Sequence, residues 1–175
     1  IYAAGRDFFP VLDIAKVADF VVWVLPLNSG AETACDDEGD KYMAAVKAQG
    51  LPTSLGLVTG VSGSKKRSSK QQKDLRRFSQ RFFATEFGDN IKVLEEGNSL
   101  HIVRAIAGMP SKVLSWRCTR SYMLVEGASF APNNPSGAQA IGPAEVPRGV
   151  LTISGYLRGI PLSANQLVHL TGKGT

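Results

Sequence analysis

The residues in this sequence that are best suited to binding chemistry form a run of lysines and arginines. Between positions 65 and 81, eight of seventeen residues are basic and one, Asp74, is acidic. Such side chains bind phosphate oxygens through charge-assisted hydrogen bonds, and neutralising several phosphates gives affinity for nucleic acid. We predict contact with an RNA phosphate backbone, which positions a protein without reading sequence. The predicted contact residues are Lys65, Lys66, Arg67, Lys70, Lys73, Arg76, Arg77 and Arg81.

The segment Gly60–Lys66, just before and into this run, superficially resembles a phosphate-binding loop. Such a loop needs the pattern G-x-x-x-x-G-K-[ST], so that backbone N–H groups surround the phosphates. Here Gly63 is followed by Ser64 and then Lys65, and the residue five positions before Gly63 is not glycine. A flexible basic loop is therefore the better interpretation.

The other candidate groups are too few or too scattered for catalysis or metal binding. Two histidines, His101 and His169, and two cysteines, Cys35 and Cys118, supply neither a convincing triad nor four zinc ligands nor a disulfide framework. The acidic residues 36–38 lack the regular spacing of a calcium loop, so a solvated loop is expected there. We expect no catalytic residue, no metal and no cofactor.

The elements that must position the basic run alternate between strands and helices. The apolar run at 19–27 is typical of a strand buried on both faces of a parallel sheet. Further strands are expected at 53–59 and 90–94, and helices at 40–49, from Ser68 or Ser69 to about Phe87, and at 99–107. This alternation predicts an α/β domain with a parallel sheet over residues 1–109.

Within the helix that ends near Phe87, charged and apolar residues separate onto opposite faces. The spacing i, i+3, i+7, i+11 puts Lys70, Lys73, Arg77 and Arg81 on one face, and an apolar stripe of Leu75, Phe78 and Phe82 lies on the other. A simple solvated helix is the alternative. The density of cations, without glutamates at the i+4 positions, favours phosphate binding.

A domain of β type is expected from residue 111 to 175, because no helical period returns after Pro110. Strands are predicted at 121–130 and 149–159, and His169 is expected in a further strand. Residues 131–148 are rich in Pro, Gly, Asn and Ala without periodicity, which predicts a mobile loop.

Composition agrees with a globular protein that has an anionic partner, since 43% of residues are hydrophobic and the net charge is +5. The longest apolar run, 20–27, is far shorter than the ~20 residues that cross a bilayer, so we expect a soluble intracellular protein. The first residue is Ile1 rather than Met, and an excerpt of a longer chain is expected.

Several segments resemble one eukaryotic family, the ribosome-biogenesis GTPases and their inactive relatives. They are 12–19, 47–53, Trp116-Arg117, 120–122 and 149–170. The last of them also resembles, more loosely, the second-domain β-barrel of translational GTPases. The resemblance implies an α/β plus β fold. Residues 1–109 would be the rear half of a translational-GTPase-like, P-loop-type domain, and 111–175 part of a translation-factor domain II β-barrel.

The family has two branches, the BMS-type nucleolar GTPases and the twenty-S rRNA accumulation branch, which has lost nucleotide chemistry. An active G domain ends its fifth strand in an Asn-Lys-x-Asp motif whose carboxylate holds guanine. This sequence has Thr59, Gly60, Val61 and Ser62 there, and Glu95, Glu96 and Gly97 replace the later Ser-Ala loop. Both departures point to the inactive branch.

The resemblance then implies a non-catalytic assembly factor for the small (40S) ribosomal subunit. It would bind the 18S rRNA precursor, contact small-subunit ribosomal proteins or other assembly factors, and sterically block translation-factor docking, in the nucleolus, nucleus and cytoplasm. Two alternatives stay open: an active BMS-type GTPase, and a protein-interaction scaffold without RNA contact.

Overall fold

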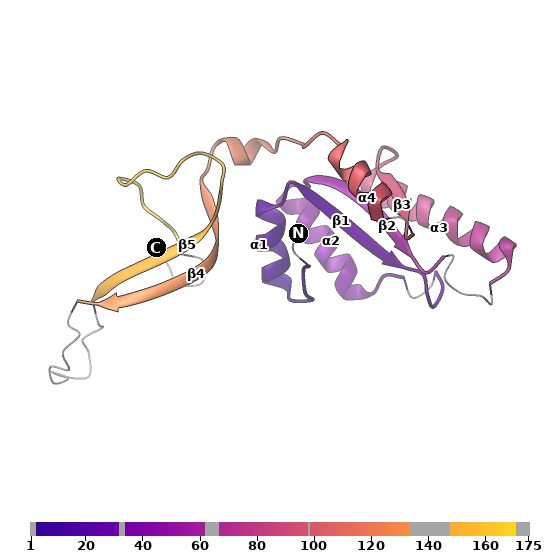
Figure 1. The fold of residues 1–175 in the computed structure, drawn as a ribbon, viewed down its shortest axis with the longest axis horizontal. Helices are drawn as coiled ribbons and strands as arrows, with labels where there is room; N and C mark the ends of the chain where they lie inside the picture. The colour runs from indigo at the N-terminus through magenta and orange to yellow at the C-terminus, as the bar shows by residue number, and fades with distance from the viewer. Residues whose placement is uncertain (1–2, 32–33, 62–66, 98, 134–147, 171–175) are drawn as a thin grey trace. The chain divides into compact units, whose positions relative to one another are not determined.

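The computed structural model describes residues 3–31, 34–61, 67–97, 99–133 and 148–170 (Figure 1). The chain divides into two compact units, Ile1–Leu114 and Ser115–Thr175. The fold is mixed, with a parallel sheet in the first unit and an antiparallel sheet in the second. None of the helices in the described ranges is long and apolar enough to cross a membrane.

The first unit is an α/β layer built on three parallel strands in the order β1-β2-β3. Its elements are α1 (Phe8–Val17), β1 (Phe20–Pro26), α2 (Asp37–Gln49), β2 (Thr53–Thr59), α3 (Ser69–Phe87), β3 (Lys92–Glu95) and α4 (Ser99–Ala107). The predicted parallel sheet is confirmed, as are the three strands and three helices, with ends that differ by up to three residues. Helix α1 was not predicted.

The two faces of this sheet are covered by different helices. Successive side chains of a strand alternate between faces. On one face, Leu25 and Val58 pack with Phe83 of α3, whose side chain is 1% exposed. On the other, Leu55 and Leu94 pack with Ala105 of α4. Helix α3 is thus anchored by its aromatic side to the centre of the sheet.

Strand β1 is not buried on both faces, contrary to the prediction from its apolar run. It lies at the edge of the three described strands, and Val22 and Val24 are 37% and 58% exposed. Leu25 points to the opposite, covered face and is 4% exposed. A continuous apolar run therefore did not distinguish a central strand from an edge strand.

Helix α2 begins at Asp37, three residues earlier than predicted. Asp36 caps it, because its carboxylate accepts a hydrogen bond from the Gly39 amide at 2.9 Å. Asp37, Glu38 and Asp40 occupy the first turn, where the helix dipole favours negative charge. The residues expected to form a solvated acidic loop are therefore largely the start of a helix.

The second unit contains a short 3₁₀ helix, Ser115–Cys118, and two antiparallel strands, β4 (Tyr122–Pro132) and β5 (Gly149–Arg158). Both predicted strands are confirmed. Ala131 and Pro132 belong to β4 rather than to the predicted mobile loop, of which 134–147 lie outside the described residues. His169 is not in a strand. It follows an irregular segment with a turn in which Gln166 N donates to Ser163 O at 3.2 Å.

Candidate nucleic-acid interface

The start of α3, which carries the basic residues, is fixed by a capping box. Gln71 N donates to Ser68 Oγ at 3.3 Å, and Ser68 N donates to Gln71 Oε1 at 2.9 Å. These reciprocal bonds satisfy two of the amides that a helix N-terminus leaves without partners. The prediction that Ser68 or Ser69 caps this helix is confirmed for Ser68.

Four basic residues of α3 lie together on its solvent side, and we name Lys70, Lys73, Arg77 and Arg81 the basic row. All four are exposed, whereas Ser79 and Phe83 on the opposite side are buried. The predicted apolar stripe of Leu75, Phe78 and Phe82 is only partly buried against the core. The buried aromatic residue of α3 in that core is Phe83, which the predicted stripe does not include. At ~1.5 Å per residue the basic row extends about 16 Å along the helix.

Arg76 differs from the basic row because it is paired within the unit. Its Nε and Nη2 atoms donate to the two carboxylate oxygens of Glu95 at 2.5 and 3.0 Å. The hydrogen bond that Arg76 donates to Glu95, and the negative charge of that carboxylate, raise the pKa of Arg76. This bidentate pair joins the middle of α3 to the end of β3.

Arg67 also makes internal contacts, although the sequence placed it with the RNA-binding residues. Its Nη2 donates to the carbonyls of Leu27 at 2.6 Å and Asn28 at 2.5 Å, and its Nη1 donates to the carbonyl of Gly60. The guanidinium therefore ties the end of β1 to the end of β2. Lys65 and Lys66 lie outside the described residues.

The residues predicted to replace a guanine-binding motif come together at the carboxyl ends of β2 and β3. Thr59 ends β2, Gly60 has a positive φ of 75° and Val61 is buried. Glu96 N donates to Val58 O at 2.8 Å, and Glu96 Oε2 accepts from Gly60 N at 3.2 Å. Ser62 lies outside the described residues, and Gly97 follows in the exposed turn before α4.

A Cβ atom at Gly60 would lie 1.9 Å from Asn28 Oδ1, so glycine is required by space as well as by conformation. The carboxyl ends of parallel strands are where open α/β sheets usually bind ligands. In this chain, hydrogen bonds of Arg67 and Glu96 cross that edge.

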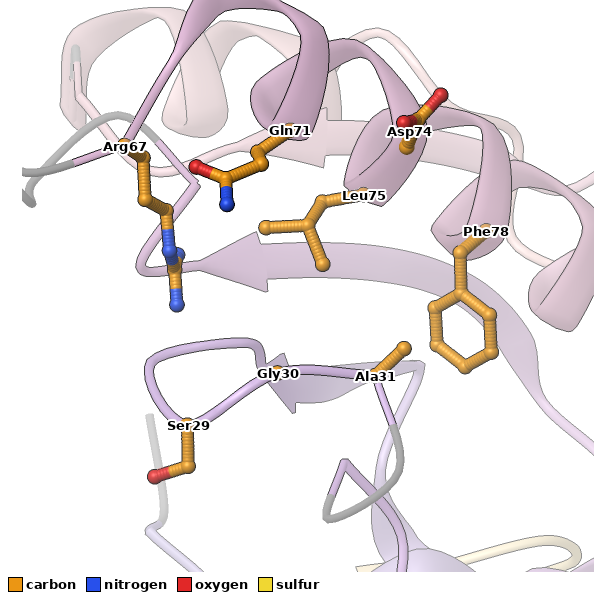
Figure 2. Close-up of a pocket in the computed structure, with 8 residues that line it drawn as sticks. All are labelled: Ser29, Gly30, Ala31, Arg67, Gln71, Asp74, Leu75 and Phe78. Carbon is orange, nitrogen blue, oxygen red and sulfur yellow. The ribbon is translucent and has the colours of Figure 1, made fainter.

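An open groove lies between the loop that follows β1 and the first turns of α3 (Figure 2). It has a volume of about 490 Å³. Its lining residues are Ser29, Gly30, Ala31, Arg67, Gln71, Asp74, Leu75 and Phe78. The groove could not be predicted from the sequence, because its wall depends on the position of the 29–31 loop. In the sequence, only the spacing of Ser68 and Gln71 indicates where Gln71 lies, at the start of the helix.

The remaining candidate groups have structural surroundings. Cys35 donates to Asp40 Oδ1 at 3.2 Å, and burial together with that bond raises the pKa of the thiol to about 11, so it is protonated at neutral pH. Trp23 packs on Phe87 with ring centroids 5.1 Å apart. His101 lies on α4, as predicted. Across the described ranges, His, Cys, Asp and Glu side chains form no group of three or more that could hold a metal.

Comparison with known proteins finds two family models that match consecutive parts of the chain. The model described as the Tsr1 G-like domain matches residues 1–108, and the model described as the AARP2CN (NUC121) domain matches residues 110–175.

Similar proteins come from distant eukaryotes. The chain is 33% identical over 175 residues to a "Pre-rRNA-processing protein TSR1 homolog" of Mus musculus, covering 99% of this chain and 20% of the relative. It is 32% identical over 176 residues to the protein of that name from Xenopus laevis, with the same shares covered. A "Ribosome biogenesis protein tsr1" of Schizosaccharomyces pombe is 26% identical over 172 residues, covering 97% of this chain and 19% of the relative. The chain spans about a fifth of the length of these curated relatives.

Proposed function

The chain belongs to the Tsr1 family, and from this premise we propose that it is a section of a non-catalytic ribosome-assembly factor that binds ribosomal RNA through the basic row of α3. The matched relatives are named for pre-rRNA processing and ribosome biogenesis, which fits an RNA partner. The observation that carries the proposal is the separation of α3 into a buried aromatic side and an exposed cationic side.

The size of the expected effect follows from counterion release. A protein that neutralises four phosphates loses roughly 50- to 150-fold in affinity when salt rises from about 50 to 200 mM. Arg76 and Arg67 contribute less than the basic row, because their guanidinium groups already bind Glu95 and the backbone carbonyls. Lys65 and Lys66 lie outside the described residues, and we propose that they add to the same contact.

Charge reversal tests the proposal on the full-length protein. The triple substitution Lys70→Glu, Lys73→Glu, Arg77→Glu should weaken binding to small-subunit rRNA and make its salt dependence shallower. A matched triple, Lys41→Glu, Lys92→Glu, Lys112→Glu, changes the net charge equally at exposed lysines outside the basic row and should leave most of the binding intact. Equal losses in the two triples would indicate attraction by net charge alone and would overturn the proposal.

The lack of nucleotide chemistry is proposed from the carboxyl ends of β2 and β3. Recognition of guanine needs an acidic acceptor after β2, and Thr59, Gly60 and Val61 provide none. Glu96 donates no hydrogen bond when ionised and accepts one from Gly60 N, while Arg67 spans the neighbouring carbonyls. We therefore expect that GTP neither binds the full-length protein nor is hydrolysed by it. Saturable binding with turnover would favour the active BMS-type alternative.

We propose a place for this chain in ribosome assembly from the types of domain that it is expected to form. Residues 1–109 would be the rear half of a translation-GTPase-like domain, and 111–175 part of a domain II-type barrel. The exposed apolar side chains of β4 and β5, among them Val125, Val150 and Leu151, support a place in a larger β-structure, because a two-stranded hairpin alone is marginally stable.

A protein of this shape would occupy the docking surface of translational GTPases on the pre-40S particle, in the nucleolus, nucleus and cytoplasm. It would contact the 18S rRNA precursor and small-subunit proteins or other assembly factors. Competition on isolated 40S subunits tests this steric role: the full-length protein should displace a translational GTPase stoichiometrically, and simultaneous binding of both would contradict it.

A further inference from the structure

The groove beside the basic row has the lining of a site for one flat, partly apolar group. Leu75 and Phe78 project from α3 toward the loop that carries Ala31, and together they form an apolar floor and wall (Figure 2). The volume of about 490 Å³ lies within the range of ~300–1,000 Å³ that is usual for small-ligand sites.

Two polar groups stand at one end of this apolar slot. The amide of Gln71 is held in one orientation, because its Oε1 accepts from Ser68 N at 2.9 Å. Its Nε2 donor is left to point into the groove toward Arg67 and Leu75 (Figure 2). The guanidinium of Arg67, fixed by backbone carbonyls, lies at the same end. Guanidinium planes and aromatic rings stack on unpaired RNA bases, and an amide donor pairs with a ring nitrogen or carbonyl.

The groove and the basic row are neighbouring sides of one helix. Gln71 follows Lys70 and Phe78 follows Arg77 in the sequence, and each step of one residue turns the side chain by about 100° around the helix axis. A nucleotide whose phosphate lies on the row can therefore turn its base into the groove. The cations alongside favour RNA over a peptide as the occupant.

We propose that this groove binds one unpaired purine base of the RNA whose phosphates lie on the basic row. The inference rests on the proposed function and adds to it a preference for unpaired nucleotides over a continuous duplex. A purine offers the larger stacking surface and ring-nitrogen acceptors for the Gln71 Nε2 donor.

The probe is an RNA hairpin with one bulged 2-aminopurine, and its control is the same stem without the bulge. Each RNA is titrated with full-length protein. Stacking of one base on aromatic and guanidinium groups should favour the bulged hairpin about tenfold. The fluorescence of 2-aminopurine should fall as the base stacks. Thermal unfolding of every variant verifies that the fold is retained.

Two variants disturb the groove without removing a cation. Ala31→Leu fills the slot (Figure 2), and its matched control, Ala44→Leu, makes the same change at an exposed alanine of α2 that does not line the groove. Gln71→Glu keeps the capping box, which accepts either residue, but replaces the Nε2 donor by an acceptor. We expect Ala31→Leu and Gln71→Glu to lose the preference for the bulge, and Ala44→Leu to keep it.

The possible failures are distinguishable. If wild-type protein binds both hairpins equally with the salt dependence of several phosphate contacts, the base site is wrong and the proposed RNA contact stands. If neither hairpin binds, the RNA contact itself fails. If Ala31→Leu keeps the preference and loses a crosslink to a protein partner instead, the groove is a peptide site and the inference is overturned.

Discussion

At the scale of single residues, charge type alone did not show which cations are available to a partner. Arg67 and Arg76 belong to the same basic run as Lys70 and Lys73, yet one binds backbone carbonyls and the other binds Glu95. Arginine suits both roles, because its planar guanidinium makes several directed hydrogen bonds at once. Among the basic residues of this run that the structure describes, the basic row is what remains exposed after these internal contacts are made.

Arg67→Ala should destabilise the first unit by about 2 kcal/mol, since hydrogen bonds from a charged group to three backbone carbonyls are lost. Chemical denaturation of wild type and variant measures the change. Arg67→Lys should recover only part of the loss, because one ammonium cannot reproduce the fork geometry. An Arg67→Ala variant as stable as wild type would contradict this structural role.

At the scale of elements, most of the first unit could be predicted because its signals are local. The strand at 53–59 and the helix at 99–107 have the predicted bounds, and Ser68 caps α3 as its hydroxyl and the following residues indicate. The predictions that failed concern features that depend on neighbouring elements of the fold. The exposure of Val24 on the edge strand β1 could not be read from its own apolar run, and the groove exists only where the 29–31 loop meets α3.

The packing of α3 on the sheet depends on Gly56. A Cβ atom there would lie 2.8 Å from the ring of Phe83, which is too close without a shift of the helix. Gly56→Ala should therefore cost about 1–3 kcal/mol of unfolding free energy. Phe83→Leu alone should also lower the unfolding free energy. The double substitution should lower it by less than the sum of the two single effects, because the smaller side chain at position 83 makes room for the new Cβ atom. A strictly additive double-mutant cycle would contradict this account of the close approach.

The N-terminus of α2 gives a pH dependence with a defined sign. The Gly39 N–H and the Arg6 guanidinium lower the pKa of Asp36 in the folded state. The stability that this carboxylate contributes is therefore present above its unfolded pKa of about 4 and is lost as pH falls through the lower folded value. Unfolding of wild type and Asp36→Asn, compared from pH 7 to pH 2, should show a difference at neutral pH that disappears in acid. A constant difference across this range would contradict the assignment.

At the scale of the whole molecule, family membership and the basic row lead to the same proposal by independent routes. The Tsr1 G-like match covers residues 1–108, and within that domain α3 presents four exposed cations on the side away from the sheet. The carboxyl edge of the sheet is bridged by Arg67 and Glu96. We thus propose that a GTPase-like layered domain holds RNA through a helix surface.

The most direct test of this claim is ultraviolet crosslinking of the full-length protein on assembling small-subunit particles, followed by mass spectrometry of peptide–RNA adducts. The account predicts adducts within residues 69–87, at or beside the basic row, and their loss in the Lys70→Glu, Lys73→Glu, Arg77→Glu variant. Chemical crosslinks from that helix to proteins alone, with RNA adducts confined to other parts of the chain, would contradict it.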